Sequence, residues 1–310
     1  MNRYNTPLRY PGGKQKLAAF IVEVMFENGL VGAEYAEPYA GGAGVAIELL
    51  LTGKAAHVHL NDSWPGVYAF WRSILTAPEE FCRRIMRASL TVDEWRRQRE
   101  ILRRANEFSQ IDVGFSFFYL NRCNRSGILS GGVIGGLEQD GKWKMDARFP
   151  RNELIRRVEA IAAKKRAITI RNWDAEKFIL EYIPKLPRKT LVYCDPPYYQ
   201  KSDRLYQNHY RPEDHARIAT IIQQRLKRPW LVSYDCAPAI LRYYSRRRLF
   251  FYNLQYNAAN AYKGGEVFVF SDLLKVPAKS VVACVNDALK RAPPGPAKCR
   301  RAKKRQLIAT

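Results

Sequence analysis

The order of apolar and polar positions predicts an α/β protein built on a mostly parallel sheet. Short uncharged runs rich in β-favouring residues alternate with longer segments whose apolar residues recur at helical spacing. Because strands separated by helices are typical of parallel sheets, we expect most strands to run in one direction and the final pair to be antiparallel. The predicted strands are one beginning at Glu34, then 56–60, 167–171, 191–195, 230–233, 249–254 and 266–270; the predicted helices are 14–26, 45–51, 152–163, 175–182 and 212–226, with one more after Asp235.

A long helical stretch interrupts this alternation between the second and third predicted strands. Residues 64–120 show mainly helical spacing and are dense in arginine, and the glycine-rich stretch that follows is typical of a mobile loop or hairpin. We therefore predict a catalytic domain formed by 1–75 and 151–276, with a mainly helical subdomain inserted at 76–150. The proline-rich and basic residues 277–310 are predicted to form a disordered tail.

The charge of the chain narrows the choice of partner. Its 52 Lys and Arg against 29 Asp and Glu give a formal net charge of +23 and a pI near 9.9. Self-repulsion of this size is tolerated most easily by a protein that meets a polyanion, so nucleic acid is the first candidate partner and an anionic membrane surface the second. The sequence shows neither a leader pattern nor an apolar run near the length of a membrane span. We expect a cytoplasmic, nucleoid-associated protein that does not bind membranes.

The cysteines indicate neither a disulfide framework nor a zinc site. The six are scattered, with no C-x-x-C pair and no Cys/His cluster. We therefore expect a chain that works in a reducing compartment without a metal ion.

The stretch 191–199 carries the candidate chemistry. Its apolar run ends in Asp195-Pro196-Pro197-Tyr198, and since prolines cannot continue a central strand, Asp195 should stand at a strand's carboxyl end, where open α/β sheets bind ligands. An ionised Asp195 and the next carbonyl can accept hydrogen bonds from a nucleobase amine and localise its lone pair, held in place by the stiff Pro196 and Pro197. Tyr198 offers a face for an extruded base. The alternative is a strand followed by a turn with an exposed acid.

A glycine-rich turn and two acids at strand ends indicate a nucleotide-like cofactor. Gly41, Gly42 and Gly44 lie between the first strand and a helix, where main chain must approach a ligand closely. Asp62 follows Gly41 by 21 residues, the spacing expected for an acid that binds ribose hydroxyls, although it could instead cap the next helix. Asp174, at the end of the third strand, could bond a cofactor ring or cap a helix.

The N-terminal segment is a further candidate for cofactor binding. A Pro-Gly-Gly turn precedes a predicted helix that begins at Lys14. Amides at a helix start and the charge of Lys14 would favour a carboxylate. The alternative is an N-terminal arm with a tight turn.

The segment after the aromatic run at 117–119 has the composition of a DNA-contacting element. It is rich in the residue types that read base edges and grip phosphates. We expect DNA contacts there; the alternative is a flexible loop with no partner. The candidate residues are Tyr119, Asn121, Arg122, Asn124 and Arg125.

Four stretches resemble the Dam-type DNA adenine methyltransferases, which use S-adenosylmethionine. They are Arg9-Tyr10-Pro11-Gly12-Gly13-Lys14, Glu37-Pro38-Tyr39-Ala40-Gly41-Gly42-Ala43-Gly44, Asn61-Asp62 and Asp195-Pro196-Pro197-Tyr198. The motif order is similar too, over roughly residues 6–272. The resemblance implies a Rossmann-like methyltransferase sheet and a recognition hairpin that starts near Tyr119. It also implies that the cofactor is contacted by Tyr10, Lys14, Glu37, Asp62 and Asp195.

Our hypothesis is methyl transfer from S-adenosylmethionine to the exocyclic amine of adenine in double-stranded DNA. The alternatives are the same chemistry on the cytosine amine or on adenine in RNA, and a DNA-binding relative that has lost catalysis. A nicotinamide dehydrogenase would share the glycine turn but has no use for Asp-Pro-Pro-Tyr. We expect a monomer on DNA, with a cognate restriction endonuclease as a candidate partner. The residues beyond Arg122 differ from the family pattern, so no target sequence is carried over.

Overall fold

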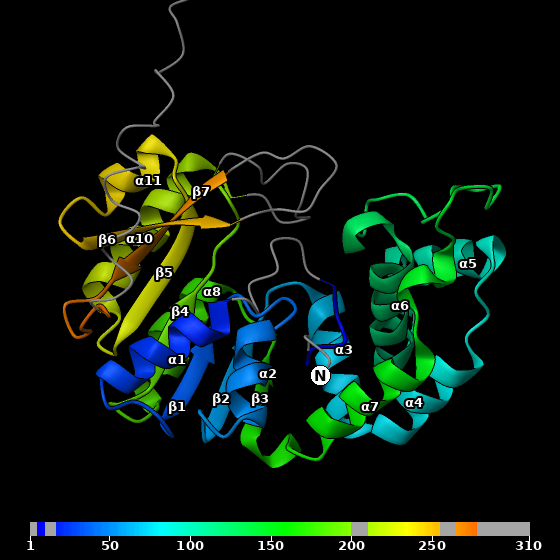
Figure 1. The fold of residues 1–310 in the computed structure, drawn as a ribbon, viewed down its shortest axis with the longest axis horizontal. Helices are drawn as coiled ribbons and strands as arrows, with labels where there is room; N and C mark the ends of the chain where they lie inside the picture. Colours follow the sequence, from blue (N-terminus) through cyan, green and yellow to red (C-terminus); the bar gives the residue numbers. More distant parts are fainter. Residues whose placement is uncertain (1–4, 10–16, 200–209, 255–263, 278–310) are drawn as a thin grey trace, which may run out of the picture.

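A seven-stranded sheet organises the molecule, and a body of helices lies beside it (Figure 1). The computed structural model describes residues 5–9, 17–199, 210–254 and 264–277. The strand order is β3-β2-β1-β4-β5-β7-β6, and all pairs are parallel except those of β7 with β5 and β6. The predicted mostly parallel sheet with an antiparallel final strand is therefore confirmed. The strands are β1 Glu34–Glu37, β2 His57–Asn61, β3 Ile168–Arg171, β4 Leu191–Cys194, β5 Trp230–Asp235, β6 Arg248–Leu254 and β7 Gly264–Phe270.

Helices cover both faces of the sheet, so its central strands are buried on each side. In β4, Leu191 and Tyr193 face one hydrophobic core, whereas Val192 and Cys194 face the other. This double burial explains why the strand reads as a continuous uncharged run. The helices are α1 Ala18–Glu27, α2 Gly44–Leu51, α3 Pro65–Thr76, α4 Pro78–Arg87, α5 Val92–Arg103, α6 Gln110–Cys123, α7 Arg151–Ala162, α8 Ala175–Lys177, η6 Phe178–Tyr182, α10 Pro212–Arg225 and α11 Pro238–Tyr243.

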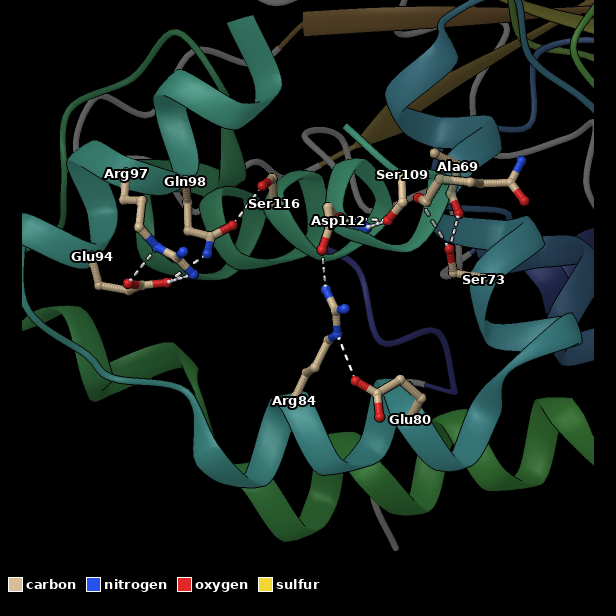
Figure 2. A network of polar contacts seen from close by, with 11 residues as sticks. Ala69, Ser73, Glu80, Arg84, Glu94, Arg97, Gln98, Ser109, Asp112 and Ser116 are labelled. Atoms are coloured by element: carbon tan, nitrogen blue, oxygen red, sulfur yellow. Dashed lines mark hydrogen bonds and ion pairs between the residues drawn. The ribbon is translucent and has the colours of Figure 1, made fainter. Parts of the chain in front are cut away.

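We call α4, α5, α6 and the loop up to residue 150 the helical body, and α6 is its centre. From Val113 onward every residue of α6 is buried, which accounts for its aromatic run. Its Gly114 faces α3 so closely that a Cβ atom would lie 2.6 Å from the carbonyl oxygen of Ala69. Figure 2 shows Arg84 of α4 bonded to Asp112 of α6 at 2.6 Å. Helices α3 and α7, which flank the predicted insert 76–150, pack on α6 and α4.

No helix among the described residues is long and apolar enough to cross a membrane. They also contain no group of three or more His, Cys, Asp or Glu side chains placed to hold a metal ion.

Candidate active site

The candidate site lies where the strand order reverses. Strand β1 pairs with β2 on one side and with β4 on the other, and all three are parallel. Their carboxyl ends therefore meet at one edge of the sheet, the place where open α/β sheets bind ligands. This topology brings together Glu37, the glycine turn, Asp62 and Asp195, which are up to 158 residues apart in sequence.

Side chains of α3 and of the N-terminal segment donate hydrogen bonds to the carbonyls of the glycine turn. Gly41 has φ 46°, a left-handed conformation that glycine adopts without the Cβ penalty. The indole nitrogen of Trp71 donates to the Gly41 carbonyl at 2.9 Å, and the Thr6 hydroxyl donates to the Gly42 carbonyl at 2.6 Å. The residue pattern did not identify Trp71 or Thr6, because nothing local links either one to the turn.

Asp62 joins the end of β2 to the glycine turn. Its Oδ2 accepts a hydrogen bond from the Gly41 amide at 2.9 Å, and its Oδ1 accepts one from the Trp64 amide at 2.9 Å. Burial raises the pKa of Asp62 to about 6, while the two amides act in the opposite direction. Asp62 is not the residue that caps α3, since that position is Trp64. The acid therefore lies beside the glycine turn, and its bond to ribose hydroxyls stays a prediction.

Asn61 connects the carboxyl ends of β1, β2 and β3 through hydrogen bonds, a role that the sequence did not predict. Its Nδ2 donates to the carbonyls of Pro38 and Trp173, each at 3.0 Å, and its Oδ1 accepts from the Trp173 amide at 3.0 Å. Asn61 is fully buried. The neighbouring acid Asp174 is exposed and accepts from the Glu176 amide at 2.8 Å, so it caps α8.

Three side chains hold the Asp-Pro-Pro-Tyr loop in place. The Ser233 hydroxyl donates to Oδ1 of Asp195 at 2.6 Å, and the Tyr198 hydroxyl donates to Oε1 of Glu266 at 2.6 Å. Oδ1 of Asp235 accepts from the next amide along the loop, that of Tyr199, at 2.8 Å. The three partners lie on β5 and β7, so the loop is fixed by the strands on that side of β4. This arrangement orients Asp195 before any ligand arrives.

The ring of Tyr198 is covered in this structure. Only 5% of the residue is exposed, and its hydroxyl is bonded to the buried Glu266. Pro196 is buried and Pro197 is half-buried. A base can therefore stack on Tyr198 only if part of its surroundings moves.

Glu37 is the second carboxyl group of this region and is held differently from Asp195. It is buried at the end of β1, where its Oε1 accepts from the Tyr35 hydroxyl at 3.0 Å and from the Ala46 amide at 3.2 Å. Burial raises the pKa of Glu37 to about 8, and the negative charge of Asp195 acts in the same direction. At neutral pH Glu37 is therefore mostly uncharged, so Asp195 has no repelling negative charge from Glu37 nearby.

This titration predicts a pH dependence of stability. The folded-state pKa of Glu37 lies above its ordinary value of 4.5. The stabilisation that protonated Glu37 gives to the folded state is therefore full below pH 4.5. It is lost as the pH rises towards 8, because the unfolded chain ionises first. Over that window the free energy of unfolding should fall by up to about 1.4 kcal/mol per pH unit. Glu37→Gln keeps the acceptor but cannot ionise, so its stability relative to wild type should rise with pH. Denaturant unfolding at pH 5, 7 and 9 measures this difference, and a constant difference would contradict it.

Four of the five candidate DNA-contacting residues are buried and bonded inside the protein. Tyr119, Asn121, Arg122 and Asn124 are each 7% exposed or less. The Tyr119 hydroxyl donates to the Ser89 carbonyl at 2.8 Å. Oδ1 of Asn124 accepts from the Trp95 indole at 2.7 Å, and its Nδ2 donates to two carbonyls of the following loop. Burial and these internal bonds do not favour direct DNA contact by the four, and Arg125 alone of the five is exposed.

Asn121 and its neighbours instead hold the N-terminal segment. Oδ1 of Asn121 accepts from the Arg9 amide at 2.7 Å, and its Nδ2 donates to the Arg9 carbonyl at 2.6 Å. Gly127 approaches the same carbonyl so closely that a Cβ atom would lie 2.6 Å from the oxygen. Arg122 donates to the carbonyls of Arg148 and Pro7, and burial together with nearby arginines lowers its pKa to about 9.

Arg9 leads directly into the predicted cofactor segment. Tyr10 and Lys14, its two predicted cofactor residues, lie outside the described residues, as does the tail from 278 onward. The bonds from Asn121 therefore anchor the last described residue before Tyr10. Since Asn121 lies on α6, this helix holds Arg9 in place.

Comparison with known proteins assigns the family. The sequence model of the D12 class N6 adenine-specific DNA methyltransferases matches residues 10–263. No curated protein matches the chain. Among solved structures, an rRNA methyltransferase (aviRa) from Streptomyces viridochromogenes is similar at 13% identity and a TM-score of 0.36, covering 84% of this chain and 86% of that one. That similarity is too low to support an argument. The family match spans most of the chain, including the glycine turn and Asp195-Pro196-Pro197-Tyr198, so the chain belongs to the D12 class N6 adenine-specific DNA methyltransferases.

Proposed function

We propose that this enzyme transfers a methyl group from S-adenosylmethionine to the N6 amine of adenine in double-stranded DNA. The family supports adenine and DNA as the target. The observation that carries the proposal is the meeting of Asp195 with the glycine turn and Asp62 at the switch point of the sheet. We further propose that it acts as a monomer on DNA, with a cognate restriction endonuclease as a candidate partner.

The residues at the switch point fit the proposed cofactor. Asp62 would accept hydrogen bonds from ribose hydroxyls, since each of its carboxylate oxygens can accept bonds beyond the one it makes to an amide. The left-handed turn at Gly41 lets main chain approach the ligand. The other proposed cofactor-binding residues are Tyr10 and Lys14 of the N-terminal segment, together with Glu37 and Asp174. When bound, S-adenosylmethionine supplies an electrophilic methyl group on a sulfonium.

Asp195 would act on the target amine. One N–H of the amine donates to the Asp195 carboxylate, and the other donates to the Pro196 carbonyl, so the nitrogen becomes pyramidal with a localised lone pair. Ser233 keeps the carboxylate oriented through its 2.6 Å bond. After transfer the nitrogen carries one proton too many, and Asp195 can accept it and pass it to solvent. Positioning supplies the remainder of the rate enhancement.

The DNA contacts are proposed to come from the helical body. Arg125 is exposed, and on the loop that follows, Leu137 is 52% and Trp143 64% exposed. The Lys142 amine lies 6.0 Å from the centre of the Trp143 ring. Exposed apolar side chains beside cations suit contact with both bases and phosphates. The buried Asn121, Arg122 and Asn124 would then support this loop from within.

A direct experiment tests the proposed reaction. The protein is expressed in a bacterial host that lacks adenine methylation, and the genomic DNA is sequenced for modified bases. We expect N6-methyladenine at one short sequence, absent from cells that express Asp195→Ala. N4-methylcytosine, or methylation confined to RNA, would assign the chemistry to a different target.

Cofactor binding gives a second test. Replacing Asp62 with alanine should weaken the affinity for S-adenosylmethionine by about 10- to 100-fold, because hydrogen bonds to a charged acceptor are each worth roughly 1.5–3 kcal/mol. Calorimetric titration measures the dissociation constant. Asp174→Ala is the companion variant: a similar loss would place it at the cofactor, whereas unchanged affinity would leave it as a helix cap only. An Asp62→Ala protein that binds as tightly as wild type would remove Asp62 from the cofactor site.

A further inference from the structure

The edge of the sheet opposite the candidate active site is strongly basic. Strands β1 to β6 all begin at this edge, and β7 ends there. The connecting residues at this edge are 28–33, 52–56, 163–167, 183–190, 226–229, 244–247 and 271–277. Together they contain twelve Lys and Arg, with Asp272 as their one acid. We call these residues the amino edge; the twelve are Lys54, Lys164, Lys165, Arg166, Lys185, Arg188, Lys189, Lys227, Arg228, Arg246, Arg247 and Lys275.

Half of these twelve cations have exposed side chains without a bonding partner in the described part of the chain. Arg247 pairs with Asp272, and the Arg228 guanidinium donates to the carbonyls of three residues between Pro184 and Pro187. By contrast, the side chains of two groups make no hydrogen bond or ion pair with described residues and are exposed. These groups are Lys164-Lys165-Arg166 and Lys185, Arg188 and Lys189.

The charge of the amino edge contrasts with that of the carboxyl edge. At the carboxyl edge, Asp235 ends β5, and Asp62, Asp174 and Asp195 follow the ends of β2, β3 and β4. Arg171, which ends β3, is a cation at this edge. Within the described part of the chain, the cations of the amino edge therefore lie at the opposite end of the strands from these acids. Like charges are costly to hold together in one place unless a polyanion neutralises them.

The size of the amino edge suits a duplex. Neighbouring strands lie about 4.8 Å apart, so the edge from β3 to β6 measures about 29 Å, close to one turn of B-form DNA. Over that length a duplex carries about 17 phosphates. The described chain also ends here, where the Lys275 amide donates to Oδ1 of Asn28 at 2.7 Å. The sequence beyond it, 278–310, contains nine Lys and Arg against one acid.

We propose that the amino edge binds the phosphate backbone of a second segment of double-stranded DNA, without sequence preference, while the opposite edge holds the target. This rests on the proposed function, since the substrate polymer itself supplies the second segment. A second DNA contact would keep the enzyme on long DNA between target sites. The contact needs no base readout, because exposed lysines and arginines in separate loops recognise charge alone.

The test compares two full-length variants that differ in charge at six positions. The neutral variant carries Lys164→Gln, Lys165→Gln, Arg166→Gln, Lys185→Gln, Arg188→Gln and Lys189→Gln, and the control variant exchanges Lys and Arg at the same positions. A donor-labelled hairpin containing the target is bound first. An acceptor-labelled duplex of G·C pairs only, about two turns long, is then titrated in. Energy transfer between the two reports simultaneous binding.

We expect wild type and the control variant to join the two DNA molecules. The neutral variant should bind the G·C duplex at least about tenfold more weakly, and the slope of log affinity against log salt should fall by about 3. Its methylation of the short hairpin should remain at the wild-type rate. Equal binding by the neutral variant, or preferred binding of an RNA hairpin or of anionic phospholipid vesicles by wild type, would overturn the proposal. If wild type methylates no hairpin but still binds the second duplex, the proposed function is wrong, whereas the proposal that the amino edge binds DNA remains supported.

Discussion

Replacing Asp195 with alanine is expected to lower methyl transfer to DNA at least about a thousandfold. The variant loses the carboxylate that accepts the amine N–H and holds the nitrogen in a reactive geometry, an electrostatic effect that acts mainly in the transition state. The Ser233 hydroxyl loses its acceptor at the same time. Transfer of a labelled methyl group to duplex DNA under single-turnover conditions measures the loss.

Two controls separate catalysis from folding and binding. Affinity for duplex DNA should stay within about threefold of wild type, because the proposed DNA contacts come from the helical body, and the thermal transition should be little changed. Ser233→Ala keeps Asp195 but removes the bond that orients it, so a partial loss of about tenfold in the rate constant is expected, with intact binding. An Asp195→Ala enzyme that turns over at a comparable rate would remove Asp195 from the catalytic role.

The second large effect is expected from Asn121→Ala. Asn121 is 2% exposed and bonds the amide and carbonyl of Arg9 and the carbonyl of Gly127. Truncation leaves these groups without their partner in a buried place, so the free energy of unfolding should fall by about 3 kcal/mol or more. Since Arg9 anchors the segment that leads to Tyr10, affinity for S-adenosylmethionine should fall as well. Denaturant unfolding and cofactor titration give the two quantities.

Arg125→Ala is the matched control for this prediction. Arg125 lies four residues further along the same segment but is exposed, so its loss should change stability by no more than about 0.5 kcal/mol. It should weaken DNA binding and leave cofactor affinity unchanged. If Asn121→Ala were as stable as wild type and defective only in DNA binding, the original expectation of direct DNA contact would be restored for Asn121.

The pattern of residues was sufficient to predict the sheet and the strand end that carries Asp195. Each predicted strand is present. In β4, burial on both faces excludes charge over the whole strand, and that exclusion is visible in the sequence. The position of Asp195 could be predicted for a local reason, since Pro196 and Pro197 end the strand whatever surrounds it. The glycine turn and Asp62 follow from the same kind of local rule.

Burial is a property of the fold, and it decided the roles that were missed. Asparagine and arginine can read bases or hold main chain with the same donors and acceptors, so composition could not separate the two uses at Asn121, Arg122 and Asn124. The high pKa of Glu37 likewise comes from what encloses it.

The sequence by itself therefore determined the sheet, the strand end that carries Asp195 and the family. The tertiary structure alone decided which polar side chains remain available to a ligand. It also decided that the loops between consecutive elements, far apart in the chain, gather their cations at the amino edge. The physical reason is that strand and turn formation depend on neighbouring residues, whereas desolvation and charge density depend on everything that the fold brings near.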